Sequence, residues 1–187
     1  MGALRARLAS GNRHKLDELR AALPGWELNL LEAEYPDETG ATYLDNARSK
    51  ALFGRALARG GWVLGEDSGV EVASLGGEPG LRSARWAGSQ DPVEALLERL
   101  GDEEDRRARY VCHLVAIGPG GEEHVGVGIL EGRIAASPAG DEGFGYDPIF
   151  VPEEERRTVA ELGDAWKRRN SHRARAAQAL EAQLDGA

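Results

Sequence analysis

The chain has 187 residues, a hydrophobic fraction of 41%, a formal net charge of −9 at pH 7 and a single cysteine. This length fits one domain, residues 1–187, built from two closely packed lobes, and the apolar fraction is sufficient for a core. The one cysteine excludes an internal disulfide framework, and no spacing of cysteine and histidine indicates zinc. The negative charge argues against a nucleic-acid backbone as partner, although local cations and a divalent metal could still bind a small polyphosphate.

No apolar run approaches the length of a membrane span, and the N-terminal residues lack the apolar block of a signal peptide. We therefore expect a soluble, cytoplasmic protein with no membrane partner. Cys112 lies in an apolar, strand-like run, and we expect it to be a small buried hydrophobe.

The first third of the sequence predicts strands that alternate with helices. Alternating apolar residues predict a strand over residues 4–9. Asn12 then caps a helix with a stripe of leucines, which ends at Pro24–Gly25. A second strand (26–31), an acidic loop (32–40) and a helix reaching about residue 59 follow in that order.

The remaining sequence is richer in strands and completes an α/β pattern. Residues 62–66 and 70–75 are predicted to be two strands, interrupted at residues 67–69. A short helix is expected from Asp91–Pro92 to Gly101, since proline is favoured at a first helical position. Two further predictions are a hairpin of residues 108–117 and 123–134 and a last helix over residues 171–184.

Lysine is rare in this chain, because only Lys15, Lys50 and Lys167 occur among 23 basic residues. Arginine and lysine are not equivalent where a compact ammonium must meet a phosphate or a base edge. The three lysines are therefore candidates for chemistry. The alternative is that they remain by chance on solvated faces.

Residues 10–15, Ser-Gly-Asn-Arg-His-Lys, join the first strand to the first helix. Such a turn presents backbone N–H groups and the positive end of the helix dipole, which suits an anion. Lys15 lies in the first turn, where a cation opposes the dipole, and this placement makes sense if the lysine faces a phosphate. The alternative is an ordinary turn between strand and helix.

Two further stretches carry carboxylates. Glu38 precedes a helix on which Asn46 and Lys50 share a face, a combination that suits a metal and phosphate; the alternative is a helix cap with a solvated face. Glu66 and Asp67 end an apolar strand, where α/β folds place their ligands. Paired acids there could hold Mg²⁺ and activate water, whereas the alternative is a turn rich in Asp, Ser and Gly.

The C-terminal third contains a candidate slot for a nucleobase. In residues 143–150, Gly-Phe-Gly-Tyr-Asp-Pro-Ile-Phe, Phe144 could stack on a base and Asp147 could accept hydrogen bonds from it. His172 and Arg173 begin the last helix and, with Lys167, could form a polar pocket. The alternatives are core aromatics for the first stretch and a surface position for the second.

Taken together, these stretches resemble the inosine triphosphate pyrophosphatase family. The resemblance rests on the motifs SGNxxK, ETGxTYxxNAxxKA, EDSGxxVxxLGGxPGxxSARWAG, GFGYDPIF and KxxxSHRxxA, which occur in this order. It covers the chain from Leu8 to the last helix. One departure is Glu66, where many bacterial relatives have a second aspartate, and this leaves its share in metal binding open.

The resemblance implies an elongated, two-lobed α/β protein with a mixed β-sheet flanked by helices and a nucleotide cleft between the lobes. It also implies a homodimer that uses Mg²⁺ to hydrolyse ITP, dITP or XTP to the monophosphate and pyrophosphate. Catalytic roles fall to Asp67, as acceptor of the water's proton, and to Lys15; Glu38 and Asp67 would hold the metal.

The same resemblance assigns the substrate contacts. Phosphate binding falls to Ser10, Gly11, Asn12, Lys15 and Lys50, with backbone contacts from Arg13 and His14 and a substrate contact from Ser68. The base pocket would consist of Phe144, Gly145, Tyr146, Asp147, Lys167, His172 and Arg173. Arg173 could donate a hydrogen bond to the 6-oxo group of hypoxanthine or xanthine. Adenine carries a 6-amino group, which is itself a donor, so it would be mismatched with the donors of the pocket.

Two other functions remain compatible with parts of the sequence. A different Mg²⁺-dependent phosphohydrolase would not need the base slot. A non-catalytic nucleotide-binding module would not need the acids Glu38 and Asp67.

Overall fold

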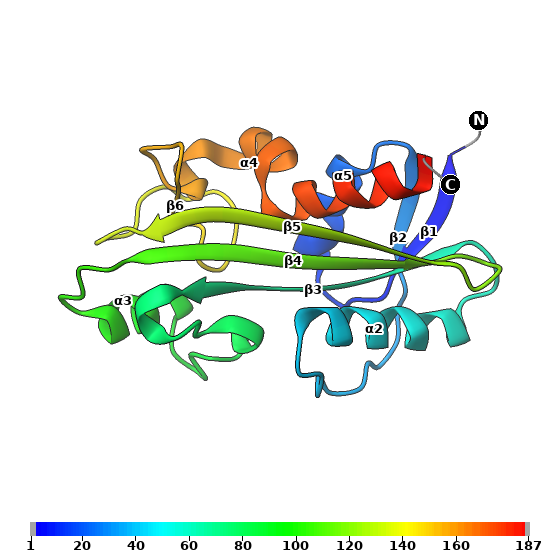
Figure 1. Ribbon diagram of the computed structural model, residues 1–187, viewed down its shortest axis with the longest axis horizontal. Coiled ribbons are helices and arrows are strands. Elements are labelled where there is room, and N and C mark those ends of the chain that lie inside the picture. The colour runs from blue at the N-terminus through cyan, green and yellow to red at the C-terminus, as the bar shows by residue number, and fades with distance from the viewer. Residues whose placement is uncertain (1–2, 186–187) are drawn as a thin grey trace. The chain divides into compact units, whose positions relative to one another are not determined.

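The computed structural model describes residues 3–185 and contains one mixed six-stranded sheet with the strand order β2-β1-β3-β4-β5-β6 (Figure 1). Strand β1 pairs in parallel with both β2 and β3, whereas β5 and β6 are antiparallel. The strands are β1 (Leu4–Leu8), β2 (Trp26–Leu30), β3 (Trp62–Val72), β4 (Arg107–Ile117), β5 (Glu123–Ile134) and β6 (Phe150–Pro152). The α-helices are α1 (Arg13–Ala22), α2 (Tyr43–Leu57), α3 (Pro92–Leu100), α4 (Val159–Asn170) and α5 (His172–Asp185), and short 3₁₀ turns cover Ala73–Leu75 and Gly80–Arg82.

The chain divides into two compact units, and neither is continuous in sequence. The first unit consists of Met1–Asp67, Cys112–Gly128 and His172–Ala187, and the second of Ser68–Val111 and Ile129–Ser171. Strands β3, β4 and β5 each contribute one part to each unit.

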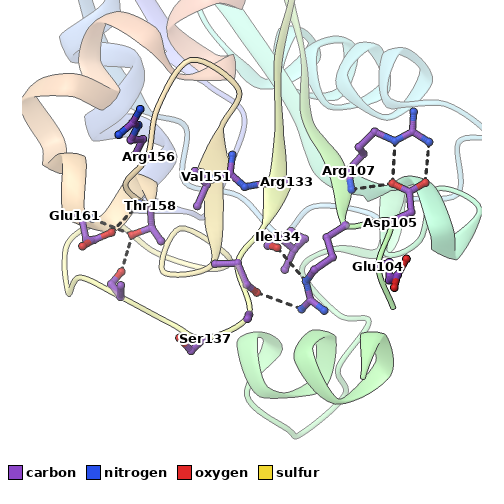
Figure 2. A pocket seen from close by; sticks show the side chains of 14 residues that line it. Glu104, Asp105, Arg107, Arg133, Ile134, Ser137, Val151, Arg156, Thr158 and Glu161 are labelled. Carbon is purple, nitrogen blue, oxygen red and sulfur yellow. Dashed lines mark hydrogen bonds and ion pairs between the residues drawn. The ribbon is translucent and has the colours of Figure 1, made fainter. Parts of the chain in front are cut away.

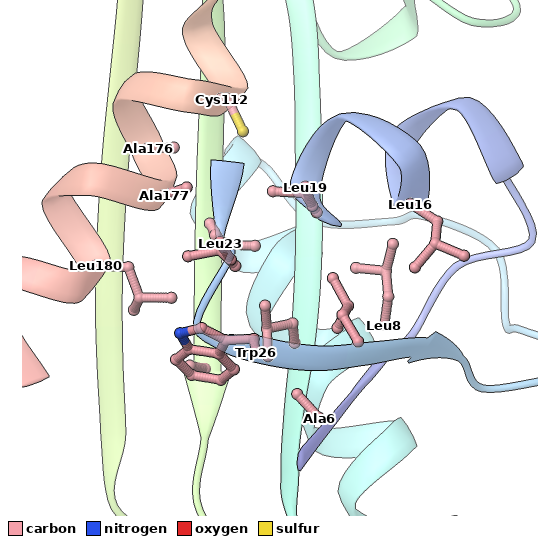
Figure 3. Packing of buried hydrophobic residues seen from close by; sticks show 14 residues of the cluster. Ala6, Leu8, Leu16, Leu19, Leu23, Trp26, Cys112, Ala176, Ala177 and Leu180 are labelled. Atoms are coloured by element: carbon pink, nitrogen blue, oxygen red, sulfur yellow. The ribbon is translucent and has the colours of Figure 1, made fainter. Parts of the chain in front are cut away.

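In the first unit, the sheet has helices on both faces, with α2 on one face and α5 on the other (Figure 1). Side chains alternate along a strand, so neighbouring residues of β4 belong to different clusters. Cys112, Leu114 and Ala116 pack with residues of α1 and α5, as Figure 3 shows for the leucines of α1 and the alanines of α5. Val115 and Ile117 pack instead with Ala47 and Ala51 of α2.

Glycines in the strands allow both helices to approach the sheet closely. A Cβ atom at Gly65 of β3 would lie 2.0 Å from the carbonyl oxygen of Ala47 and 2.6 Å from the nitrogen of Ala51. On the other face, a Cβ atom at Gly128 of β5 would lie 2.0 Å from the carbonyl oxygen of His172. The backbones of α2 and α5 therefore rest almost directly on the strands.

The second unit has its own hydrophobic core. The apolar face of α3 packs against the residues of β3, β4 and β5 that belong to the second unit and against the segment that leads into β6. The buried members include Val70, Val72, Val93, Leu96, Tyr110, Leu130, Ile149 and Phe150.

Most of the predicted elements are confirmed. The first two strands, the two N-terminal helices, the hairpin and the last helix are present, and Ala177, Leu180 and Leu184 of the last helix pack against the core. The short helix has Asp91 as its N-cap, proline in its first turn and Gly101 as its C-cap. Cys112 is fully buried, as predicted. Within residues 3–185, no helix combines the length and apolar character needed to cross a membrane.

Two predictions about secondary structure are wrong. Residues 62–72 form one continuous strand, so the expected interruption at residues 67–69 does not occur, and residues 73–75 form a 3₁₀ turn. Helix α4 and strand β6 were not predicted. A capping box between Thr158 and Glu161 begins α4, and this threonine-to-glutamate spacing is visible in the sequence.

We predict that Gly65→Ala will lower the free energy of unfolding by about 1–3 kcal/mol, because the added methyl group has to push α2 off the strand. Urea unfolding measures the change. Gly25→Ala is the matched control, because nothing lies within 4 Å of a Cβ atom there and its φ is not positive. Equal unfolding free energies for the two variants would contradict the close approach.

Candidate functional site

None of the three lysines lies on a solvated face; each contacts a buried carboxylate. The ammonium of Lys15 is 2.6 Å from Glu66, that of Lys50 is 3.1 Å from Asp67, and that of Lys167 is 2.7 Å from Asp147. All three acids are almost inaccessible to solvent. A buried carboxylate is costly unless a cation and hydrogen bonds accompany it, so the lysines are required where they stand.

The predicted anion-binding turn is formed by the residues between β1 and α1. Asn12 is the N-cap of α1, and its Oδ1 accepts hydrogen bonds from the backbone nitrogens of His14 (2.9 Å) and Lys15 (3.3 Å). Ser10 Oγ in turn accepts a hydrogen bond of 3.1 Å from the nitrogen of Asn12. Gly11, Arg13 and His14 are exposed, and no acidic residue lies in the first turn, so the helix N-terminus retains its positive potential.

Glu66 is the centre of a buried ionic network in the first unit. Its Oε2 is 2.6 Å from Lys15 Nζ, and its Oε1 accepts a hydrogen bond of 3.1 Å from Arg173 Nε. Arg173 Nη1 also donates to Glu18 at 3.1 Å. The thiol of Cys112 lies 3.5 Å from Glu66 Oε1, and burial raises the pKa of this thiol, so it stays protonated and can donate.

Asp67 is the centre of a second cluster. Its Oδ2 accepts a hydrogen bond of 3.0 Å from Asn46 Nδ2, and its Oδ1 accepts one of 3.1 Å from Lys50 Nζ. Lys50 also donates to the backbone oxygen of Glu66 at 3.0 Å and forms an ion pair with Glu38. Asn46 is fixed by the nitrogen of Gly40, which donates to its Oδ1 at 2.8 Å.

Burial and the neighbouring charges act in opposite directions on the pKa values of Asp67 and Lys50. Burial raises the pKa of Asp67 above its ordinary value, although the charge of Lys50 and the hydrogen bond from Asn46 act in the opposite direction. For Lys50, burial acts to lower the pKa, but the charges of Asp67 and Glu38 and the bond to Glu38 outweigh it, so the pKa is raised. Lys50 therefore stays charged, and Asp67 becomes a stronger base than an exposed aspartate.

The two acids at the end of the apolar strand do not act as a pair. Because β3 is continuous, Glu66 and Asp67 point to opposite faces of the sheet: Glu66 contacts α1 and α5, whereas Asp67 contacts α2. The expectation that these acids could hold one metal ion together is therefore wrong for Glu66. Both oxygens of its side chain are already taken by Lys15 and Arg173.

The residues assigned to metal are Glu38 and Asp67. Among residues 3–185, no group of three or more histidine, cysteine, aspartate or glutamate side chains could hold a metal ion. Glu38 and Asp67 nevertheless meet at one cation, the ammonium of Lys50. Across the two clusters, three cations (Lys15, Lys50 and Arg173) face four carboxylates (Glu18, Glu38, Glu66 and Asp67). Two convergent carboxylates in a region with excess negative charge fit Mg²⁺, which takes its other ligands from water and substrate phosphates.

A separate polar cluster lies in the second unit and contains most of the predicted base slot. Lys167 and the backbone nitrogen of Phe144 both donate to Asp147 Oδ2, at 2.7 and 2.8 Å, and Lys167 Nζ lies 4.6 Å from the centroid of the Phe144 ring. The hydroxyl of Tyr146 donates to the backbone oxygen of Ser83 at 3.0 Å, and burial, with the charge of Asp91, raises the pKa of Tyr146 to about 12.

The remaining predicted residues are divided between the first and the second unit. Gly145 is exposed and has a φ of 64°, a conformation that favours glycine. Ser68 is half-buried on β3 and is the first residue of the second unit. His172 and Arg173, which the sequence grouped with the base slot, begin α5 in the first unit and are buried. Their role at a base stays a prediction.

Three contributors were not predicted from the sequence. Glu18 lies one turn after Lys15 on α1, and this spacing was available as a signal. Cys112 and Tyr110 lie on β4 far from every motif, so nothing in the sequence linked them to Glu66 or Asp147.

Two open depressions in the surface contain none of the predicted site residues. One, of about 580 Å³ in the second unit, is lined by four arginines that include Arg106 and Arg107 (Figure 2). Arg106 donates to the backbone oxygens of Ile134 and Ala135, and Arg107 pairs with Asp105. The other, in the first unit, is lined by residues of β1, β2 and the segment before β3.

Known proteins are similar to this chain over nearly its whole length. Residues 6–183 match the Ham1 family. A dITP/XTP pyrophosphatase of Thermus thermophilus is 45% identical over 190 residues, covering 96% of this chain and 91% of that protein. A dITP/XTP pyrophosphatase of Bdellovibrio bacteriovorus is 42% identical over 186 residues, covering 92% and 94%. The solved structure of the Staphylococcus aureus Ham1 protein superposes with a TM-score of 0.85 at 36% identity and covers 97% of this chain and 98% of that one. This chain therefore belongs to the Ham1 family.

Proposed function

We propose that this protein hydrolyses the non-standard purine nucleoside triphosphates ITP, dITP and XTP to the monophosphate and pyrophosphate, with Mg²⁺ as cofactor. The observation that carries the proposal is the meeting of two lysines at one residue. Lys15 contacts the carboxylate of Glu66 and Lys50 contacts its backbone oxygen, directly beside Asp67. The N-terminus of α1, where the phosphates would bind, and Asp67, the candidate general base, thus lie next to each other within the first unit. The names of the relatives from Thermus and Bdellovibrio support the same activity.

The triphosphate would bind at the N-terminus of α1. Ser10, Gly11, Asn12, Arg13 and His14 make up this turn, and oriented N–H groups at a helix start favour an anion. The ammonium groups of Lys15 and Lys50 add charge where the leaving pyrophosphate becomes more negative, and such fixed charges stabilise a transition state.

Asp67 would accept the proton of the attacking water. The oxygen of this water bonds to the α-phosphorus, and the bond between the α-phosphorus and the bridging oxygen breaks. Burial raises the pKa of Asp67 toward the pH at which the protein works, and a general base is more effective when its pKa lies near that pH. Glu38 and Asp67 would hold Mg²⁺, which supplies charge neutralisation at the phosphates. Asn46 and Lys50 fix the carboxylate of Asp67 in one orientation.

The purine would be selected by Phe144, Gly145, Tyr146, Asp147 and Lys167 of the second unit, where Ser68 would add a substrate contact. The role of His172 and Arg173 at a base stays a prediction. Hypoxanthine and xanthine carry a 6-oxo acceptor that a guanidinium or ammonium can satisfy. Adenine presents a donor at this position, and a polar site rejects such a mismatch by roughly 10⁴-fold or more.

The products distinguish the proposed activity from its alternatives. With ITP and Mg²⁺, we predict that pyrophosphate and IMP are released in one step. The reason is that the turn before α1, Lys15 and Lys50 would together bind all three phosphates. Anion-exchange chromatography of the quenched reaction measures the products. Sequential appearance of IDP and inorganic phosphate would instead favour a different phosphohydrolase, and binding without turnover would favour a non-catalytic nucleotide-binding module.

Asp67→Asn should lower kcat for ITP by about 10²–10⁴-fold, because the amide cannot take the proton of water. Nucleotide binding, measured by calorimetry, should remain largely intact, since the lysines and the helix N-terminus are unchanged. Asp17→Asn on the exposed surface of α1 is the matched control, because the Asp17 side chain is 71% exposed. Turnover of Asp67→Asn at the level of this control would remove Asp67 from the proposed role.

We also infer that the protein is a homodimer. Helix α2 of the first unit leaves Leu52 and Leu57 54% and 51% exposed, and we assign these two apolar side chains to the surface that the second copy covers. Sedimentation equilibrium should give twice the mass of 20.1 kDa. Replacing both leucines by glutamate should shift the protein toward the monomer. A wild-type protein that sediments as a monomer at all concentrations would contradict the inference.

A further inference from the structure

The carboxylate of Asp147 in the second unit is saturated by donors of the protein itself. Oδ2 receives Lys167 Nζ at 2.7 Å and the nitrogen of Phe144 at 2.8 Å. Oδ1 receives the hydroxyl of Tyr110 at 3.2 Å. The Asp147 side chain is only 5% exposed, so a nucleobase has little access to its oxygens. Asp147 is therefore placed to orient its neighbours rather than to accept a hydrogen bond from the base.

The neighbours that Asp147 orients are the two groups suited to hold a purine. Lys167 is held by Asp147 with its ammonium 4.6 Å from the centroid of the Phe144 ring. The backbone of Phe144 is held by the same carboxylate oxygen. Gly143 brings this turn close, since a Cβ atom there would lie 2.3 Å from Asp147 Oδ2. A small rotation of the carboxylate would therefore move both the cation and the aromatic ring.

Tyr110 fixes the other end of this carboxylate. It lies on β4, is 7% exposed, and its ring packs on Phe150 with a centroid distance of 4.3 Å. Its hydroxyl is the donor to Oδ1, so removing it leaves a buried, charged oxygen unsatisfied. Removing only the hydroxyl keeps the ring contact and creates little empty space.

We propose that Tyr110 is a positioning residue for purine selection, which acts through Asp147 on Lys167 and Phe144. The proposal rests on the proposed function, because selection has meaning only if the second-unit cluster binds the base. The Tyr110 hydroxyl stops the carboxylate from rotating about its side-chain bonds. The ammonium of Lys167 then keeps one place relative to the Phe144 ring.

The first experiment needs no activity and uses the scarcity of lysine. Lysine labelled with ¹³C at Cε gives signals from only Lys15, Lys50 and Lys167, which Lys→Arg variants assign. In Tyr110→Phe, the Lys167 signal should shift while the Lys15 and Lys50 signals stay in place. Tyr35→Phe is the matched control, because the Tyr35 hydroxyl bonds the backbone oxygen of Leu31 in the first unit, and all three signals should stay unchanged. An unmoved Lys167 signal in Tyr110→Phe overturns the positioning role, whether or not the protein hydrolyses ITP.

The second experiment measures selection. In Tyr110→Phe, the ratio of kcat/KM for ITP to kcat/KM for ATP should fall roughly tenfold, the size expected for one hydrogen bond to a charged group. Pyrophosphate should remain the product, and the melting temperature serves to detect a general loss of structure. In an Asp147→Asn background, Tyr110→Phe should change the ratio less than about twofold, because residues that act through one another are not additive.

The outcomes separate the two proposals. A wild-type protein that releases no pyrophosphate from ITP overturns the proposed function, and the lysine signals still decide the positioning role. A normal ITP-to-ATP ratio in Tyr110→Phe, or an equal effect of the substitution with and without Asp147, overturns the action of Tyr110 on selection.

Discussion

Burying the carboxylate of Glu66 requires cations beside it, and this requirement fixes the arrangement of the first unit. Glu66 is 1% exposed and is flanked by Lys15 from α1 and Arg173 from α5. Removing an ion from water costs several kcal/mol, and removal of one partner from a buried pair typically costs about 3–5 kcal/mol. Helices α1 and α5 are therefore held in register with β3 by charge as well as by the leucines and alanines between them.

The same strand serves a second purpose on its other face. Asp67 follows Glu66 and, by the alternation of a strand, points toward α2, where Asn46 and Lys50 receive it. Gly65 makes this contact possible because it lets the backbone of α2 lie against the strand. Gly65, Glu66 and Asp67 thus provide in succession a close approach of α2, a buried acid that pairs with α1 and α5, and the acid that we propose as the general base. Because side chains alternate along a strand, shifting these residues by one position would turn Glu66 toward α2 and Asp67 toward α1 and α5.

The sequence was sufficient for the order of the elements and for the local motifs, because these depend on neighbouring residues. Asn12 as a helix cap, Asp91 before a proline and the apolar face of α5 are local signals, and all are confirmed. The role of Glu66 was missed because Asp, Ser and Gly favour a turn in isolation, whereas pairing with β1 and β4 keeps residues 62–72 extended. Tyr110 and Cys112 were missed because their partners are 37 and 46 positions away in sequence, and no periodicity reports such contacts.

The division of the chain into two discontinuous units also has a consequence during synthesis. The polypeptide passes between the units after residues 67, 111, 128 and 171, and three of these passages lie inside strands. Helix α5, which carries Arg173, is synthesised after the other described elements. Until it emerges, Glu66 lacks one of its two cations and the first core lacks its alanine face. Nascent chains that lack α5 should therefore remain incompletely folded and dependent on protection from aggregation, because contacts between distant segments form late.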